Sequence, residues 1–219
     1  MTTSQTRRRL LALSGAAGIL AATGAFTRAT AAQRRTASQA LGPFYPLTKP
    51  ADSDTDLTLI QGHRERAQGQ VIYVTGRVLN AAGKPLPGIG IELWQANSHG
   101  RYNHPGDDNP APLDPNFQGF ARLFTDADGR YRIKTIKPSG YPAGEGFVRP
   151  PHIHFDITGR SSRLVTQMYF AGEPLNDTDR LLASTGANRS SLIVTLGPPT
   201  SDLERDALLA QWDIVLESG

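Results

Sequence analysis

The chain has 219 residues, of which 38% are hydrophobic and 20% charged, so it can bury the core of one ordinary domain. It contains no cysteine, which excludes disulfide scaffolds, cysteine zinc sites, iron–sulfur clusters and thiol nucleophiles. The 22 glycines and 16 prolines favour a turn-rich β protein over a helical bundle.

The formal net charge of +3 comes from the first 31 residues, which hold four arginines and no acid. The remainder has 19 basic and 20 acidic residues. A nucleic-acid-binding domain keeps a basic surface in its folded part, so we do not expect nucleic acid as a partner.

Residues 1–31 have the pattern of an export signal. Arg7 and Arg8 precede an apolar run at Leu10–Phe26, and Ala29–Ala31 supplies the small residues that a signal peptidase accepts. The paired arginines resemble a twin-arginine signal, which exports folded proteins. We therefore predict a periplasmic or secreted protein without a stable membrane anchor. The alternative is an uncleaved anchor helix, which a 17-residue run diluted by glycines disfavours.

Residues 32–69 are polar and irregular and predict an N-terminal arm that lies over the domain. Their one aromatic segment is Gly42-Pro43-Phe44-Tyr45-Pro46, in which two prolines and a glycine exclude a helix.

Residues 70–219 predict an all-β domain, a β-sandwich of about eight strands with long active-site loops. Short apolar runs alternate with turn signals, as in sandwiches. Asp126–Gly129 predicts a hairpin turn, and only Ser201–Leu209 predicts a helix. The predicted strands are Val71–Leu79, Ile89–Ala96, Ala121–Thr125, Arg130–Ile136, His152–Thr158, Leu164–Phe170, Leu192–Leu196 and Trp212–Leu216.

Two connections are too long to be simple turns. Asn97–Gly119 carries Tyr102, and Lys137–Pro151 carries Tyr141. Long structured loops in small domains usually serve function. The first loop also contains Asp107-Asp108, which we predict to be a solvated turn.

The run His152-Ile153-His154 begins an apolar strand. Residues i and i+2 of a strand share a face, so both imidazoles point the same way. Two such histidines can bind one metal ion, whereas the alternative is a pair of half-buried core histidines.

The identity of such a metal stays open from the residues alone. His154-Phe155-Asp156 resembles half of a two-histidine-one-carboxylate Fe(II) site, but no histidine follows it. Tyr102 and Tyr141 offer phenolate oxygens that suit Fe(III). A zinc site usually takes a third histidine or a glutamate, and zinc stays possible because three histidines lie upstream: His63, His99 and His104.

Eight segments resemble, in the same order, the intradiol ring-cleavage dioxygenases, and within that family the iron-bearing β subunits of protocatechuate 3,4-dioxygenases. The likeness covers roughly residues 70–175. It implies non-haem Fe(III) as cofactor, a catechol-type substrate, and cleavage of its ring with O₂ to a cis,cis-muconate. The segments are Gly76–Leu79, Glu92–Asn97, Gly100–Tyr102, Leu113–Phe117, Thr135–Pro138, Tyr141–Pro142, Arg149–Phe155 and Thr166–Phe170.

The resemblance also implies roles for single residues. Arg149 and Tyr141 are implied as catalytic, Arg149 by stabilising negative charge that develops on the ring. The iron ligands it implies are Tyr102, Tyr141, His152 and His154, and the substrate-binding residues are Gly42, Pro43 and Gln167. The chain departs from the protocatechuate enzymes at Ala143 and Val148, where those carry tryptophan.

Two alternatives accompany this hypothesis. A metal-free, transthyretin-like binding module would explain the sandwich but not four ligand-type residues in the family's order. The second alternative concerns Arg149 alone, which would be a surface arginine paired with Asp156 or Glu145. Assembly into a homo-oligomer stays open on either interpretation.

Overall fold

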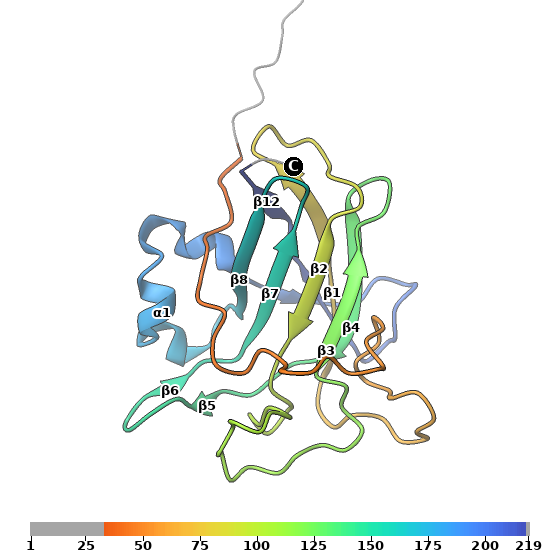
Figure 1. Cartoon of the computed structure of the whole chain (residues 1–219), viewed down its shortest axis with the longest axis vertical. Coiled ribbons are helices and arrows are strands. Elements are labelled where there is room, and N and C mark those ends of the chain that lie inside the picture. The colour runs from red at the N-terminus through yellow and green to blue at the C-terminus, as the bar shows by residue number, and fades with distance from the viewer. Residues whose placement is uncertain (1–32, 218–219) are drawn as a thin grey trace, which may run out of the picture.

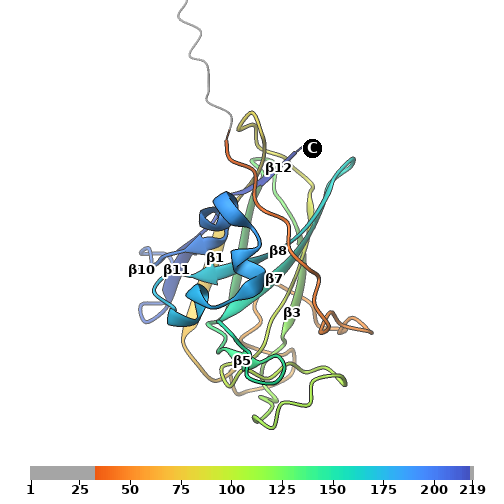
Figure 2. The same ribbon diagram turned by 90° about the vertical axis from the view of Figure 1, so that its left-hand side faces the viewer.

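The computed structural model describes residues 33–217, so the predicted leader lies outside the described residues. Two β-sheets face each other across a buried core, and Figure 2 shows both layers edge-on. The predicted all-β sandwich is therefore confirmed.

The first sheet is built around β1 (Val71–Asn80). It pairs antiparallel with β4 (Arg130–Ile136), and parallel with β11 (Leu208–Gln211) and β12 (Ile214–Leu216). The short β10 (Leu196–Gly197) extends the sheet beyond β11.

The second sheet has the order β3-β2-β7-β8-β9. Its strands are β2 (Gly90–Trp94), β3 (Phe120–Phe124), β7 (His152–Thr158), β8 (Arg163–Phe170) and β9 (Ile193–Val194). A separate hairpin joins β5 (Tyr141–Pro142) to β6 (Val148–Arg149). Eight of the twelve strands in residues 33–217 are three residues or longer, close to the predicted number.

The helical residues follow β8 and pack beside it (Figure 1). They form the 3₁₀ helices η1 (Pro174–Asp177) and η2 (Gly186–Leu192) around the short helix α1 (Arg180–Ala183). No helix within the described part of the chain is long and apolar enough to cross a membrane.

The predicted helix at Ser201–Leu209 is wrong. Residues 201–206 form turns, and Leu208 begins β11, which pairs with Ile72 of β1. The reason is tertiary, because β1 offers an unpaired edge whose hydrogen bonds a short isolated helix could not match.

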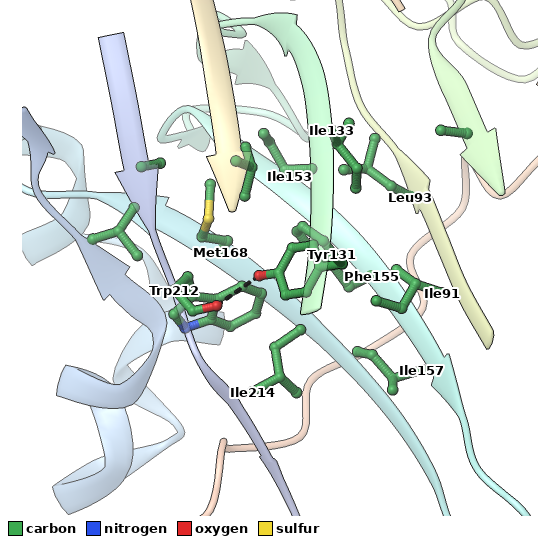
Figure 3. Packing of buried hydrophobic residues seen from close by; sticks show 14 of the residues in the cluster. Ile91, Leu93, Tyr131, Ile133, Ile153, Phe155, Ile157, Met168, Trp212 and Ile214 are labelled. Atoms are coloured by element: carbon green, nitrogen blue, oxygen red, sulfur yellow. Dashed lines mark hydrogen bonds between the residues drawn. The ribbon is translucent and has the colours of Figure 1, made fainter. Parts of the chain in front are cut away.

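The core lies between the sheets, and Figure 3 shows its packing. Strand β7 sends Ile153, Phe155 and Ile157 into this core, each with no exposed surface. The hydroxyl of Tyr131 donates to the Trp212 carbonyl at 2.7 Å, which satisfies a polar group that would otherwise be buried without a partner.

One end of the sandwich gathers the long loops and the β5–β6 hairpin (Figure 1). Strand β7 starts at this end with His152, and β2 finishes there with Trp94, which pairs with His154. The arm runs beside β8, where Gln39 N donates to Val165 O at 2.8 Å, and then crosses toward β2.

Gly76 lies where β1 changes its parallel partner from β11 to β12. The backbone of Trp212 passes so close that a Cβ on Gly76 would lie 1.9 Å from the Trp212 carbonyl oxygen. Only a residue without a side chain allows this approach.

We expect Gly76→Ala to lower the free energy of unfolding by about 1–3 kcal/mol or more, the cost of forcing extra atoms into a packed site. Urea denaturation measures the effect. Gly90→Ala is the matched control, because its added Cβ would make its closest contact at 3.5 Å. Equal stability of Gly76→Ala and wild type would contradict the close backbone approach.

Candidate metal centre

Four predicted ligand side chains meet at the loop end of the sandwich. His152 and His154 come from β7, Tyr141 from β5, and Tyr102 from the loop after β2. The Nε2 atoms of the two histidines lie 3.2 Å apart, and Tyr141 Oη lies 3.5 Å from His152 Nε2. The Tyr102 ring is perpendicular to that of Tyr141, with centroids 5.3 Å apart. All four residues are at most 4% exposed.

Both imidazoles lie on one face of β7, opposite the apolar side chains that enter the core. His152 Nδ1 lies 2.7 Å from the Pro150 carbonyl, which can only accept a hydrogen bond. The proton of neutral His152 therefore sits on Nδ1, and its Nε2 lone pair faces the other ligands.

The hydroxyl of Tyr102 is buried and has no hydrogen-bond partner among the described residues. Its backbone is well held, because Tyr102 N donates to Asp107 Oδ2 at 2.7 Å. Asp107 is only 6% exposed, so our prediction of a solvated Asp107-Asp108 turn is wrong for its first member. The Asp107 carboxylate is buried because it accepts hydrogen bonds from the backbone amides of Tyr102 and Asn109.

Aromatic and backbone groups enclose the four ligands. The Trp94 ring stacks on His154 with centroids 4.9 Å apart, and Phe44 of the arm lies 4.6 Å from Tyr102. Gly42, which has a φ of 80°, passes so near that a Cβ there would approach His154 Cε1 to 3.0 Å. The arm thus forms one wall of the centre.

Burial decides the protonation of the four ligands in the metal-free protein. It raises the pKa of Tyr102 well above its ordinary value, and Tyr141 raises it further. It also raises the pKa of Tyr141, although Arg149 acts in the opposite direction. Burial and the Arg149 charge together lower the pKa of His152 well below its ordinary value and that of His154 to about 3. All four side chains are therefore neutral at pH 7.

Within residues 33–217, Arg149 carries the positive charge that contacts these ligands. It is 4% exposed, so it is no surface arginine, and its partner is Asp179 rather than Asp156 or Glu145. Arg149 Nε donates to Asp179 Oδ2 at 2.9 Å, and Nη1 lies 3.1 Å from His152 Nε2. Burial works against the charge, but Tyr169, Asp179 and Tyr141 outweigh it and raise the pKa of Arg149.

The hairpin holds Tyr141 and Arg149 directly opposite each other. Residues 143–147, which we call the hairpin tip, project from this pair and are exposed or half-buried. Gly144 and Gly146 of the tip have positive φ and no atom near their Cβ positions.

The other three histidines make different contacts. His63 is hydrogen-bonded to Asn116 and His99 to Gln68. His104 accepts from Gly106 N and packs its ring against Phe44, beside the centre. Residues 33–217 contain no group of three His, Cys, Asp or Glu that could hold a metal. Asp156 is engaged by Arg163 at 2.7 Å. The amide of Gln167 is held by protein groups at both ends, so its contact with substrate stays a prediction, as does that of the exposed Pro43.

Comparison with known proteins adds to this geometry. A family model described as Dioxygenase matches residues 41–218. The chain is 46% identical over 179 residues to the protocatechuate 3,4-dioxygenase beta chain of Burkholderia cepacia, which covers 80% of this chain and 76% of that protein. The chain belongs to the intradiol ring-cleavage dioxygenase family.

More distant members share less of this dioxygenase chain. Catechol 1,2-dioxygenase of Acinetobacter baylyi is 32% identical over 140 residues, covering 58% of this chain but only 43% of its own length. The dioxygenase domain of a carbohydrate-binding fusion protein from Streptomyces sp. SirexAA-E superposes with a TM-score of 0.64 at 28% identity, covering 85% of this chain and 100% of that one. A mercury-inhibited catechol 1,2-dioxygenase from Acinetobacter sp. ADP1 gives 0.63 at 28% identity, covering 84% and 63%.

Sequence reasoning missed the group that neutralises Arg149. Asp179 has no exposed surface and caps α1 through Leu182 N at 2.7 Å, a role that its place before an apolar run indicates. Nothing in the local pattern indicates its second role beside Arg149. Tyr169 offered a weak signal, because it shares a strand face with Gln167.

Proposed function

We propose that this dioxygenase cleaves a catechol-type ring between its two hydroxyl-bearing carbons, with O₂, to a cis,cis-muconate. The observation that carries the proposal is the burial of two phenols and two imidazoles around one point, beside a fixed arginine. A β-sandwich that only bound ligands would have no use for a buried phenol without a partner.

The residues fit a ferric ion. Tyr102, Tyr141, His152 and His154 would hold it with oxygen and nitrogen donors. The buried Tyr102 hydroxyl, which has no hydrogen-bond partner among the described residues, is an oxygen donor of the right chemistry. When bound, ferric iron ionises phenol ligands and draws electron density from a catecholate, which lets the ring react with O₂. Both atoms of O₂ enter the muconate product, so the reaction requires no external reductant.

The protein's own groups then have defined tasks. As the phenolate that bound ferric iron would produce, Tyr141 Oη would accept a proton from a catechol hydroxyl. Arg149 directs Nη1 toward the same point and stabilises negative charge on the ring, since its charge is held by fixed bonds in a water-poor pocket. The arm residue Gly42 leaves room beside His154 that a side chain would fill.

Loading the purified protein with ferric iron tests the proposal. We expect a visible tyrosinate-to-iron band and O₂ uptake with a panel of substituted catechols, with muconates identified as products. A colourless protein, or one without O₂ uptake across the panel, would favour the metal-free binding module.

Loss of one ligand should show in the iron itself. We expect Tyr102→Phe and His152→Ala each to lower iron content or shift the visible band, measured by metal analysis and absorption. Tyr131→Phe is the matched control, since it removes a buried phenol hydroxyl that bonds only to Trp212. Full colour and activity in both ligand variants would contradict the site.

Arg149 has a structural role and a proposed catalytic role, and a double variant can separate the two. We expect Arg149→Ala to cost about 3–5 kcal/mol of stability, because it leaves the buried Asp179 carboxylate without a balancing positive charge. Adding Asp179→Asn removes that charge while an asparagine still caps the helix, so stability should recover in large part. Turnover should stay roughly 10²–10³-fold low in both variants while iron is retained. Recovery of turnover together with stability would refute the catalytic role.

We also propose export by the twin-arginine route, which suits a protein that folds around a metal before it leaves the cytoplasm. The proposal rests on Arg7-Arg8 and the apolar run behind them.

Replacing Arg7 and Arg8 by lysine should retain the precursor in the cytoplasm, as followed by cell fractionation. The same double replacement at Arg34 and Arg35, which follow the predicted leader, is the control and should not affect export. Normal appearance of the first variant in the periplasm would show that the leader has been misassigned.

A further inference from the structure

The two β8 side chains that bind Arg149 are themselves held by the N-terminal arm. Arg149 Nη2 donates to the Tyr169 hydroxyl at 2.7 Å and to Gln167 Oε1 at 2.9 Å. The Tyr169 hydroxyl donates to Gln39 Oε1 at 2.7 Å, and Gln167 Nε2 donates to the Ala40 carbonyl at 2.9 Å. Two neighbouring arm residues thus support both partners of the arginine.

The orientation of each group in this network follows from what it can donate. The Leu181 carbonyl, 3.0 Å from Gln39 Nε2, can only accept, so the amide of Gln39 must turn its oxygen toward Tyr169. The single Tyr169 proton then goes to Gln39, and the hydroxyl lone pairs remain for Arg149.

Tyr169 has a competing acceptor. Its hydroxyl also lies 2.9 Å from Gln167 Oε1, the oxygen that accepts from Arg149. Without Gln39, the Tyr169 proton would turn to this oxygen, and the hydroxyl would rotate away from the orientation in which its lone pairs face Arg149. Tyr169 and Gln167 have no exposed surface, so bulk water cannot take the place of Gln39.

We propose that Gln39 is a positioning residue for Arg149, acting through the Tyr169 hydroxyl. Asp179 fixes the Nε side of the guanidinium and also reaches Nη2 at 3.4 Å. The shorter bonds at the Nη2 corner go to Gln167 and to the Tyr169 hydroxyl that Gln39 orients. The remaining Nη1 is thereby aimed at the metal centre, 3.1 Å from His152 Nε2. The arm is then a working part of the site and more than a cover.

The test compares Gln39→Met, which removes the acceptor at similar size, with Gln39→Glu, which keeps it. In the metal-free protein, we expect hydrogen exchange of the Arg149 side-chain N–H groups, followed by NMR, to quicken at least severalfold in Gln39→Met. The second readout is turnover, which rests on the proposed ring cleavage. There kcat should fall about tenfold, with KM and iron content unchanged. Gln39→Glu should stay within about threefold of wild type.

Thr166→Val is the matched control. It also removes one bond to the arm, from Thr166 Oγ1 to the Ala37 carbonyl at 2.7 Å, but this hydroxyl bonds to no member of the Arg149 network. We expect it to leave kcat and Arg149 exchange unchanged. Tyr169→Phe should lose as much kcat as the double variant Gln39→Met/Tyr169→Phe, since Gln39 acts through that hydroxyl.

Unchanged Arg149 exchange and kcat in Gln39→Met would overturn the proposal. An equal loss of kcat in Thr166→Val would also overturn it, because Gln39 would then only attach the arm to the domain. Faster Arg149 exchange in a protein that cleaves no catechol would support the positioning role and refute the proposed function.

Discussion

A single buried positive charge governs the arrangement of this protein's site. A guanidinium that is 4% exposed is stable only if its donors are bonded and its charge is balanced. Arg149 meets both needs through segments far apart in sequence: the hairpin that carries it, the start of α1, strand β8, and indirectly the arm. These segments must all be in place before the charge is accommodated, so the fold and the site are specified together.

Strand β7 holds two of the four metal-centre residues in place through its packing in the core. Its odd-numbered residues, such as Ile153 and Phe155, are core side chains, and its even-numbered His152 and His154 form half of the metal centre. Core packing therefore fixes the imidazoles, since any slip of the strand would carry apolar side chains to the wrong face. The phenols come from outside the two large sheets, Tyr102 from the loop after β2 and Tyr141 from β5.

Local pattern was enough to predict β7 and its two faces, because a period of two is written in consecutive residues. It also sufficed for the sandwich, and the order of the motifs sufficed for the family. Local pattern could not predict contacts between residues that are far apart in the sequence. Asp179 is 30 residues from Arg149 in sequence, and no local feature links them. The helix expected at Ser201–Leu209 failed for the same reason, because the edge of β1 decides its conformation.

The β5–β6 hairpin has a base that holds two residues of the site and a tip that holds none of them. Its base pairs Tyr141 with Arg149, while the tip, residues 143–147, extends beyond them and makes few demands on its own side chains. A hairpin keeps its register at the base when its turn is lengthened or substituted. Related enzymes can therefore diverge in the tip, and a protein engineer can vary it, while the phenol and the guanidinium are inherited in place.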